Sequence, residues 1–144
     1  MFENAKSFHG LGVDDLQKAR EFYGDTLGLQ VDVVDEQYGL LTLHRPGGET
    51  TLLYLSPDLQ VGNYTVLNFS IDDIDATVDA LTARGVEFLR YDGAPQDEKG
   101  ITRGMGPDIA WFKDPAGHTL SVLKEIEGLT AMKKIATTIS AIVT

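Results

Sequence analysis

LGVDDL at residues 11–16 and FSIDDI at residues 69–74 carry the same pattern 58 positions apart. In each stretch a strand-like run leads into a pair of aspartates and then into a helical pattern. A carboxylate at such a junction can accept hydrogen bonds from the free N–H groups of the first helical turn, where it also meets the positive end of the helix dipole. The chain therefore contains an internal repeat of one strand–helix unit.

Helices and strands follow in the same order in both copies. Apolar residues at three- and four-residue steps predict one helix from about Asp15 to Leu27, ended by Gly28, and another from about Ile74 to Ala83, ended by Gly85. The predicted strands that follow lie at residues 29–34, 40–44 and 51–55 in the first copy, and at 86–90, 109–112 and 119–123 in the second. The predicted fold class is α+β, with two tandem βαβββ modules.

A family resemblance rests on two of these stretches. VDDL at residues 13–16 with FYGDTLGL at 22–29, together with WFKDPAGH at 111–118, resembles the paired modules of the vicinal oxygen chelate superfamily, which includes glyoxalases, bleomycin-resistance proteins and extradiol dioxygenases. The resemblance implies one domain at residues 1–127, with modules at about 6–57 and 64–125 whose sheets curve into a cup that holds the ligand or metal. Residues 128–144 form a C-terminal extension.

The positions at which this family binds metal carry other residues here. Metal-dependent members have a histidine five residues before the apolar residue that leads into each helix, and a glutamate on the fourth strand of each module. The matching residues are Phe8, Val66, Tyr54 and Ser121, none of which is a histidine or carboxylate. His9 is one residue away, but that shift would turn every apolar residue of its strand to the other face. We therefore expect no metal and no cofactor.

Strand alternation predicts which side chains line the cup. The predicted ligand-binding residues on the strands are Phe8, Tyr54, Val66, Asn68, Trp111 and Ser121. The long segment 91–108 adds Arg103 and Met105 as candidate lid contacts, with a mobile connection as the alternative. His44 and His118 are assigned to turns. The acidic run Asp72, Asp73, Asp75 and Asp79 is interpreted as helix capping and a solvated face.

Composition disfavours several classes of binding partner and a membrane location. Twenty-two acidic and 12 basic side chains give a formal charge of −10, which disfavours nucleic acid and anionic lipid as partners. Cysteine is absent, and no run approaches the roughly 20 apolar residues of a membrane span. Since residues 1–8 do not resemble a secretory signal, we expect a cytoplasmic protein.

Three function classes remain open. The first is a metal-free protein that binds a small, partly aromatic organic molecule. The second is a lyase or isomerase of glyoxalase type or a dioxygenase-related enzyme, for which Tyr54 is the only inward ionisable group and a poor base at pH 7. The third is an antibiotic-sequestering protein of the bleomycin-resistance type, since a cationic drug would gain from the negative charge.

The C-terminal extension has an apolar stripe of its own. The stripe consists of Leu129, Met132, Ile135, Ile139 and either Ile142 or Val143. This spacing predicts a helix that packs on its own domain or on a second subunit, because so short a helix is marginal without packing. We expect a homodimer in which this stripe is covered.

Overall fold

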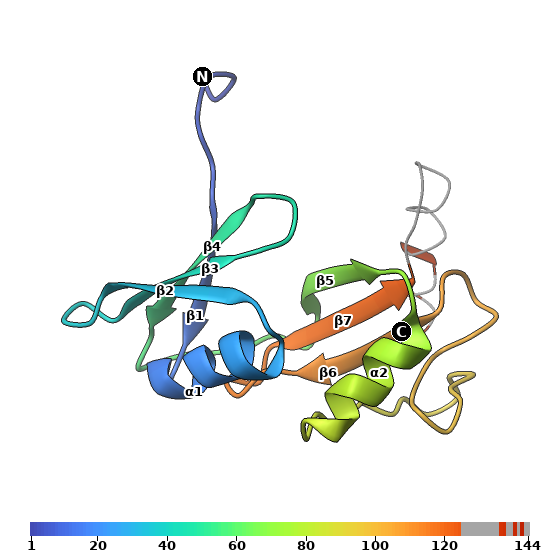
Figure 1. Ribbon diagram of the computed structural model, residues 1–144. Helices are drawn as coiled ribbons and strands as arrows, with labels where there is room; N and C mark the ends of the chain where they lie inside the picture. Colours follow the sequence, from blue (N-terminus) through green and yellow to red (C-terminus); the bar gives the residue numbers. More distant parts are fainter. Residues whose placement is uncertain (125–135, 138–139, 141, 143–144) are drawn as a thin grey trace. The chain divides into compact units, whose positions relative to one another are not determined.

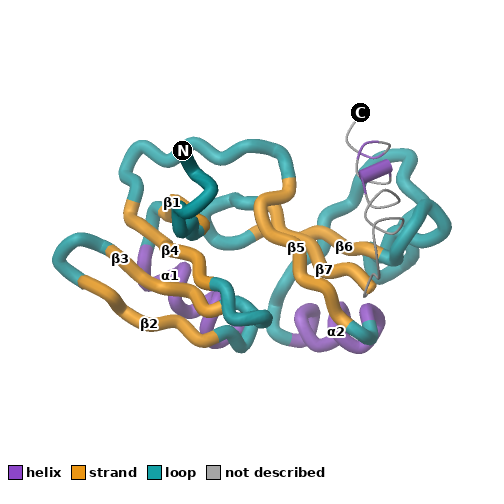
Figure 2. The backbone as a smooth tube through the Cα atoms, turned by 90° about the horizontal axis from the view of Figure 1, so that it is seen from above, coloured by secondary structure: helices purple, strands orange, loops and turns teal. Residues whose placement is uncertain are grey.

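A computed structural model describes residues 1–124, 136–137, 140 and 142. The chain divides into two compact units, Met1–Val61 and Gly62–Thr144, and each is described by itself. Each unit contains one sheet with helix on one side of it (Figures 1 and 2). The α+β class is confirmed.

The first unit is a four-stranded sheet. Its elements are β1 (His9–Val13), α1 (Leu16–Arg20), η1 (Glu21–Thr26), β2 (Gln30–Asp35), β3 (Leu40–His44) and β4 (Thr50–Leu55). The strand order is β1-β4-β3-β2, with β1 parallel to β4 and the other pairs antiparallel. The register of β2 against β3 shifts between Val33 and Asp35, so the outer strand is irregular near its end.

The first helix differs from its prediction in its second half. Asp15 caps it by accepting a hydrogen bond from the N–H of Lys18 at 3.0 Å, as the aspartate pattern predicts. From Glu21 to Thr26 the chain is π-helical rather than α-helical, and the N–H of Leu27 donates to the carbonyl of Phe22 five residues earlier. Over a single turn the two helix types bury nearly the same side chains, so periodicity could not separate them.

The second unit repeats the arrangement with one strand fewer. Its elements are β5 (Thr65–Ile71), α2 (Ile74–Ala83), β6 (Ile109–Lys113) and β7 (Thr119–Lys124). The order is β5-β7-β6, with β5 parallel to β7 and β6 antiparallel to it. Asp73 caps α2 by accepting from the N–H of Ala76 at 3.0 Å, so the second aspartate of each pair is the helix cap.

The strand predicted at residues 86–90 is wrong. The segment makes an isolated bridge, Phe88 with Phe112, and a backbone hydrogen bond from Leu89 to Trp111, while the N–H of Val86 turns back to the carbonyl of Leu81 at the end of α2. Arg90 then donates to the carbonyl oxygens of Asp97 and Glu98. These bonds hold the chain in the loop that follows, so it runs beside β6 for only a short distance.

Each core lies between a sheet and its helix. Leu11, Val13, Leu41, Leu43 and Leu53 are buried in the first unit, and Leu67, Phe112, Leu120 and Val122 are buried on the equivalent strands of the second. Strand alternation predicts Leu11, Val13, Leu53, Leu67, Leu120 and Val122 as helix-facing, and these are buried, whereas Leu55, predicted in the same way, is 47% exposed. Of the predicted C-terminal stripe, Leu129, Met132, Ile135, Ile139 and Val143 lie outside the described residues. Ile142 is described, and it is helical and half-buried.

Candidate functional site

The face of the first sheet opposite α1 has no helix of its own unit on it. Strand register places a set of side chains on this face: Gly10, Gly12, Gln30, Asp32, Thr42, His44, Thr50, Leu52 and Tyr54. We call this set, together with Phe8, which immediately precedes β1 and lines the adjacent hollow, the first open face. Thr50 lies opposite His44 and Gly12 opposite Tyr54. Apolar, hydroxyl and ionisable groups therefore share one surface, as in many ligand sites.

Two aromatic side chains and two glycines define one side of this face. Phe8 is 73% exposed and Tyr54 43% exposed. The ring of Tyr54 lies against β1, where a Cβ on Gly10 would be 3.7 Å from Cε1 and a Cβ on Gly12 3.5 Å from Cε2. Because the glycines carry no side chains, the ring can rest on the backbone of β1 with its other side available.

A hollow of about 490 Å³ lies at the start of β1 and the turn between β3 and β4. It is lined by Ser7, Phe8, His9, Arg45, Gly48, Glu49 and Thr50. Arg45 forms an ion pair with Glu49 at 3.0 Å, while its buried Nε has no hydrogen-bond partner within the described part of the chain. The hollow thus combines an aromatic wall with a cation that is only partly neutralised.

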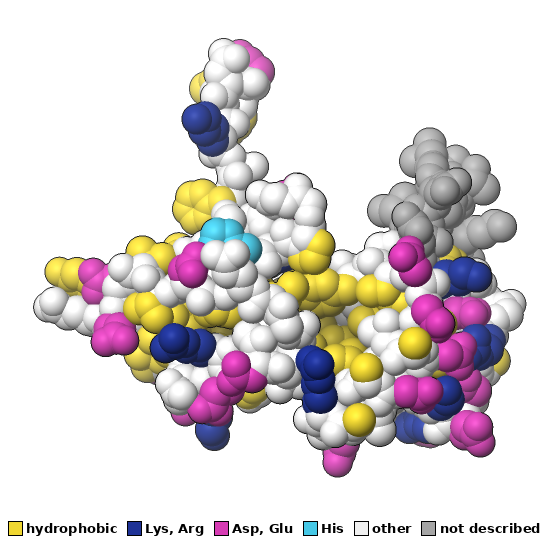
Figure 3. Space-filling model, in the orientation of Figure 1, with side chains coloured by type: hydrophobic (Ala, Val, Ile, Leu, Met, Phe, Trp, Pro, Cys, Tyr) yellow, Lys and Arg dark blue, Asp and Glu magenta, His cyan; other side chains and the backbone are white. Residues whose placement is uncertain are grey.

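His44 and Asp32 form a hydrogen-bonded pair on the same face. Nε2 of His44 is 2.7 Å from Oδ2 of Asp32, and the amide of Gln30 donates to the same oxygen at 3.2 Å. Figure 3 shows histidine side chains at the surface of the first unit beside an acidic group and an exposed apolar one. Sequence reasoning missed this pair by assigning His44 to a turn. The signal was present, because the run LLTLH alternates and gives His44 the face of Thr42.

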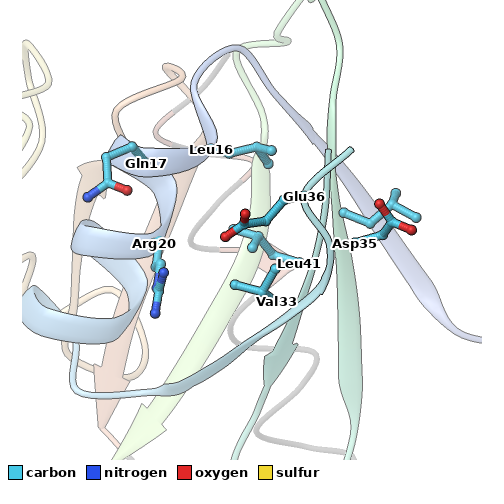
Figure 4. Close-up of a pocket in the computed structure, with 8 residues that line it drawn as sticks. Leu16, Gln17, Arg20, Val33, Asp35, Glu36 and Leu41 are labelled. Atoms are coloured by element: carbon cyan, nitrogen blue, oxygen red, sulfur yellow. The ribbon is translucent and has the colours of Figure 1, made fainter. Parts of the chain in front are cut away.

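A smaller cleft lies on the helix side of the first sheet (Figure 4). Leu16, Gln17 and Arg20 of α1 line one wall, and residues around Val33, Glu36 and Leu41 line the other. Its volume of about 100 Å³ is below the roughly 300 Å³ at which organic ligand pockets begin. The first open face is therefore the better candidate site in this unit.

The equivalent face of the second unit brings three predicted site residues together. Asn68, Ser121 and Trp111 lie side by side on β5, β7 and β6. The hydroxyl of Ser121 donates to Oδ1 of Asn68 at 2.5 Å, and the indole N–H of Trp111 donates to Thr65 at 3.1 Å. Asn68 is exposed and Val66 half-buried.

Trp111 itself is covered. It is 2% exposed and packs with Ile109 and Leu123. Leu89, Tyr91 and Ile142 pack against this cluster, with the Tyr91 ring edge-on to the indole at 5.4 Å. Partial burial raises the pKa of Tyr91 above its ordinary value. The indole is accordingly a core residue in this structure and reaches a ligand only if its cover moves.

Arg103, predicted as a lid contact, holds the loop to α2. Its Nε donates to Asp97 at 3.0 Å, Nη1 to Asp108 at 2.8 Å, and Nη2 to both oxygens of Asp75 at 2.9 Å. Acidic and basic side chains gather on this unit in Figure 3. With every guanidinium nitrogen bonded to a carboxylate, the structure gives Arg103 a structural contact. Met105, the other lid candidate, is half-buried.

The same network changes the acidity of its members. The Arg103 guanidinium holds the pKa of Asp75 below its ordinary value. Burial opposes ionisation of Asp97, but hydrogen bonds from the N–H of Ile101 and from Arg103 outweigh it, and the pKa of Asp97 is lowered. Lys99 bonds to Asp79 at 2.9 Å, which raises the lysine pKa. The acidic run thus makes ion pairs as well as a cap, while Asp72, Asp73 and Asp79 remain exposed as a solvated face requires.

The donor set does not fit a metal ion. Within residues 1–124 and the described part of the tail, no three His, Asp or Glu side chains converge as ligands. Phe8 and Val66 have no donor atom, Tyr54 lies against the glycines of β1, and the hydroxyl of Ser121 is bonded to Asn68.

None of the helices among the described residues has the length and apolar character needed to cross a membrane.

Comparison with known proteins identifies the family. Residues 7–122 match the Glyoxalase/Bleomycin resistance protein/Dioxygenase superfamily, and the chain belongs to it. It is 28% identical over 123 residues to the "Putative lactoylglutathione lyase" of Brassica oleracea var. gemmifera. The aligned region covers 78% of this chain but only 41% of that protein's length.

Solved structures agree on the fold. A superfamily member from Sphaerobacter thermophilus is 26% identical, with a TM-score of 0.61 over 83% of this chain and 98% of that one. The fosfomycin resistance protein FosX from Listeria monocytogenes has a TM-score of 0.68 at 18% identity, over 92% and 98% of the two chains. At that identity the second likeness shows the fold alone.

Proposed function

We propose that the protein binds a small, partly aromatic organic molecule on its first open face, without a metal ion. Two observations carry the proposal: the accessible ring of Tyr54 lies on the bare backbone of Gly10 and Gly12, and the exposed ring of Phe8 lines the hollow at the start of β1. Aromatic groups gain both buried area and favourable ring geometry when another ring packs on them.

Size and polarity support the same conclusion. The hollow beside Phe8, about 490 Å³, lies within the range of about 300–1,000 Å³ for organic ligand sites. Thr50 at its rim and Thr42 on the open face offer hydroxyl groups that can orient a ligand. Asn68 is the exposed polar group of the second unit's predicted set. Trp111 contributes by supporting that unit's sheet, since Tyr91 and Ile142 pack against its cluster.

Ligand-observed NMR with a library of aromatic fragments tests this proposal. Phe8→Ala and Tyr54→Ala should each weaken the fragments that bind wild type by at least tenfold. Tyr38→Ala is the matched control, because Tyr38 is an equally accessible aromatic at 72% exposure but lies in the turn between β2 and β3. Fragments that bind all four proteins equally would place the ligand elsewhere. Native mass spectrometry of the freshly purified protein would then identify a natural ligand by its mass.

The absence of a metal is a separate part of the proposal. Its support is the chemistry of the side chains at the four family positions, of which only Tyr54 and Ser121 carry an oxygen donor. Elemental analysis after dialysis should find far less than one divalent ion per chain. About one zinc, nickel, manganese or iron per chain would contradict this.

We also propose a cytoplasmic homodimer. The support for the dimer is the part of the stripe at Leu129, Met132, Ile135 and Ile139, which needs a surface to cover it, whereas Ile142 packs on the Trp111 cluster of its own unit. Light scattering should give the mass of a dimer for the full chain and the mass of a monomer for a chain ending at Glu127. A monomer mass for the full chain at micromolar concentration contradicts the proposal, and a dimer that survives truncation moves the contact away from the tail.

A further inference from the structure

We propose that the aromatic ligand carries a single carboxylate, and that Arg45 binds this carboxylate in the hollow at the start of β1. The inference rests on the proposed function, because it names the chemical class of the ligand bound there. It adds a charged group that the sequence alone did not supply, since the side chains predicted to bind the ligand from the strands carry no charge at neutral pH.

The turn between β3 and β4 fixes the backbone of Arg45. Its N–H donates to the carbonyl of Glu49 at 2.8 Å, and its carbonyl accepts from the N–H of Gly48 at 3.2 Å. Gly47 and Gly48 both have positive φ, which glycine adopts without strain. A Cβ on Gly48 would meet no atom beyond its chain neighbours within 4 Å. The turn therefore holds the arginine in place and leaves open space at the edge of the hollow.

The guanidinium of Arg45 is only partly satisfied. Nη2 pairs with Oε2 of Glu49 at 3.0 Å, whereas the buried Nε has no hydrogen-bond partner among the described residues. The arginine side chain is 21% exposed and that of Glu49 is 73% exposed. A buried donor without a partner costs free energy, and more so on a charged group. A surface ion pair kept for stability needs no such donor, so the arrangement favours a second acceptor.

A ligand carboxylate can satisfy this guanidinium better than Glu49 does. The N–H groups of arginine form a planar fork that bonds both oxygens of a carboxylate in parallel. Because the Glu49 side chain lies mostly in solvent, it can swing away from Nη2, and the guanidinium can then turn its Nε–Nη2 edge toward the hollow. Glu49 therefore competes with the ligand for Arg45.

The charges around the hollow favour one negative charge on the ligand rather than two. Arg45 is the one permanent cation among the described residues that line the hollow, and Glu49 is an anion beside it. The chain has a formal charge of −10, so a dianion would meet more repulsion than a monoanion. Phe8 offers its ring to the ring of the ligand, and Ser7 and Thr50 offer hydroxyl groups. These groups together suit an aromatic monocarboxylate.

Saturation-transfer NMR titration at pH 8 tests the inference with three probes: phenylacetate, the neutral phenylacetamide, and phenyl phosphate, which is a dianion at this pH. Wild type should bind phenylacetate about tenfold more tightly than either of the others. Arg45→Gln should remove the difference between phenylacetate and phenylacetamide. Arg45→Lys should remove most of it, because lysine keeps the charge but has no planar fork. Arg20→Gln is the matched control, since Arg20 is an exposed cation on α1, and its affinities should equal those of wild type.

Glu49→Gln distinguishes an arginine that binds the ligand from one that only stabilises the turn. Loss of the competing carboxylate should tighten phenylacetate binding by about threefold and leave phenylacetamide binding unchanged. Glu36→Gln removes the same charge from the exposed turn between β2 and β3 and should change neither. If Glu49→Gln leaves phenylacetate binding unchanged or weaker, Glu49 does not compete with the ligand. Circular dichroism checks that each variant is folded.

The outcomes separate this inference from the proposed function. Equal binding of phenylacetate and phenylacetamide, or a preference that survives Arg45→Gln, overturns the carboxylate assignment. The proposed function then still stands if Phe8→Ala and Tyr54→Ala weaken both probes. Tighter binding of phenyl phosphate also overturns the carboxylate class. A preference lost in Arg45→Gln but unaffected by Phe8→Ala and Tyr54→Ala supports the arginine site and contradicts the aromatic one. Failure of phenylacetate to bind wild type overturns the inference.

Discussion

The two open faces differ although the same motif builds both. On the first, β1 carries Gly10 and Gly12. The ring of Tyr54, on the neighbouring strand β4, lies against these glycines and is partly accessible. On the second, Trp111 lies on the outer strand β6 and is covered by Tyr91 and Ile142. The covering residues come from the long loop and the tail, both of which lie outside the repeated motif. The long loop and the tail therefore cover this face of the second unit, while Tyr54 on the first open face stays accessible.

The strongest test of this difference is to remove one aromatic residue from each face. Trp111→Ala should destabilise the fold by about 3–5 kcal/mol, as expected for a large buried side chain. Tyr54→Ala should cost less than about 1 kcal/mol, because the ring is 43% exposed. Urea unfolding followed by circular dichroism measures both. Similar losses in the two variants would mean that the first face is as closed as the second.

The ion-pair network offers a second difference between the units. Arg103→Met leaves Asp75, Asp97 and Asp108 without their shared cation, and we expect the melting temperature to fall by about 3–6 °C. Arg20→Met is the control, since Arg20 is an exposed cation on α1 of the first unit. Thermal unfolding at low and at 1 M salt checks the cause. A loss independent of salt would point to packing rather than charge.

Acid should affect the second unit first. The pKa values of Asp75 and Asp97 are lowered in the folded chain, so both bind protons more readily when unfolded. Their stabilising effect is complete above the ordinary carboxyl pKa and is lost as the pH falls from about 5 through the folded-state values. The single tryptophan, Trp111, reports this unit by fluorescence. Arg103→Met should flatten the dependence of its unfolding midpoint on pH between 5 and 3, and an unchanged slope would exclude the network as the cause.

Ile142 should have the smallest effect. It is half-buried against the Trp111 cluster, so Ile142→Ala should cost only about 1 kcal/mol and shift the tryptophan emission to longer wavelength as water reaches the indole. Lys124→Ala, an exposed change at the end of β7, is the control. Emission identical to wild type would show that Tyr91 and Leu89 are sufficient to cover this face.

Local patterns predicted much of this structure. The aspartate pairs predicted both helix caps, and period-two alternation predicted the buried positions Leu11 and Val13 of β1 and Leu53 of β4. The π-helical turn at Glu21–Thr26 was not predictable, because it differs from an α-helix by one residue in a single turn. The loss of the strand at 86–90 depends on hydrogen bonds from Arg90 to a later loop, which no local pattern reports.

The candidate site was predicted less well, for the same reason. Alternation predicted one face for Phe8 and Tyr54, and the register confirms the row of Asn68, Ser121 and Trp111. It could not show that Tyr91 and Ile142 cover Trp111, or that three carboxylates surround Arg103, since these contacts join segments distant in sequence. His44 was predictable from its strand, but its pairing with Asp32 required the register of β2 against β3.

The irregular end of β2 has a consequence for the behaviour of the protein at high concentration. Within the first unit β2 is the outer strand, and Val33 and Val34 are 38% and 56% exposed. If such an apolar outer strand were straight, it could pair with the same strand of another molecule and begin aggregation. The register shift between Val33 and Asp35 interrupts the regular row of hydrogen-bonding groups, and the carboxylates of Asp32 and Asp35 repel their own copies. A dimer of this chain therefore has reason to form through a surface other than β2.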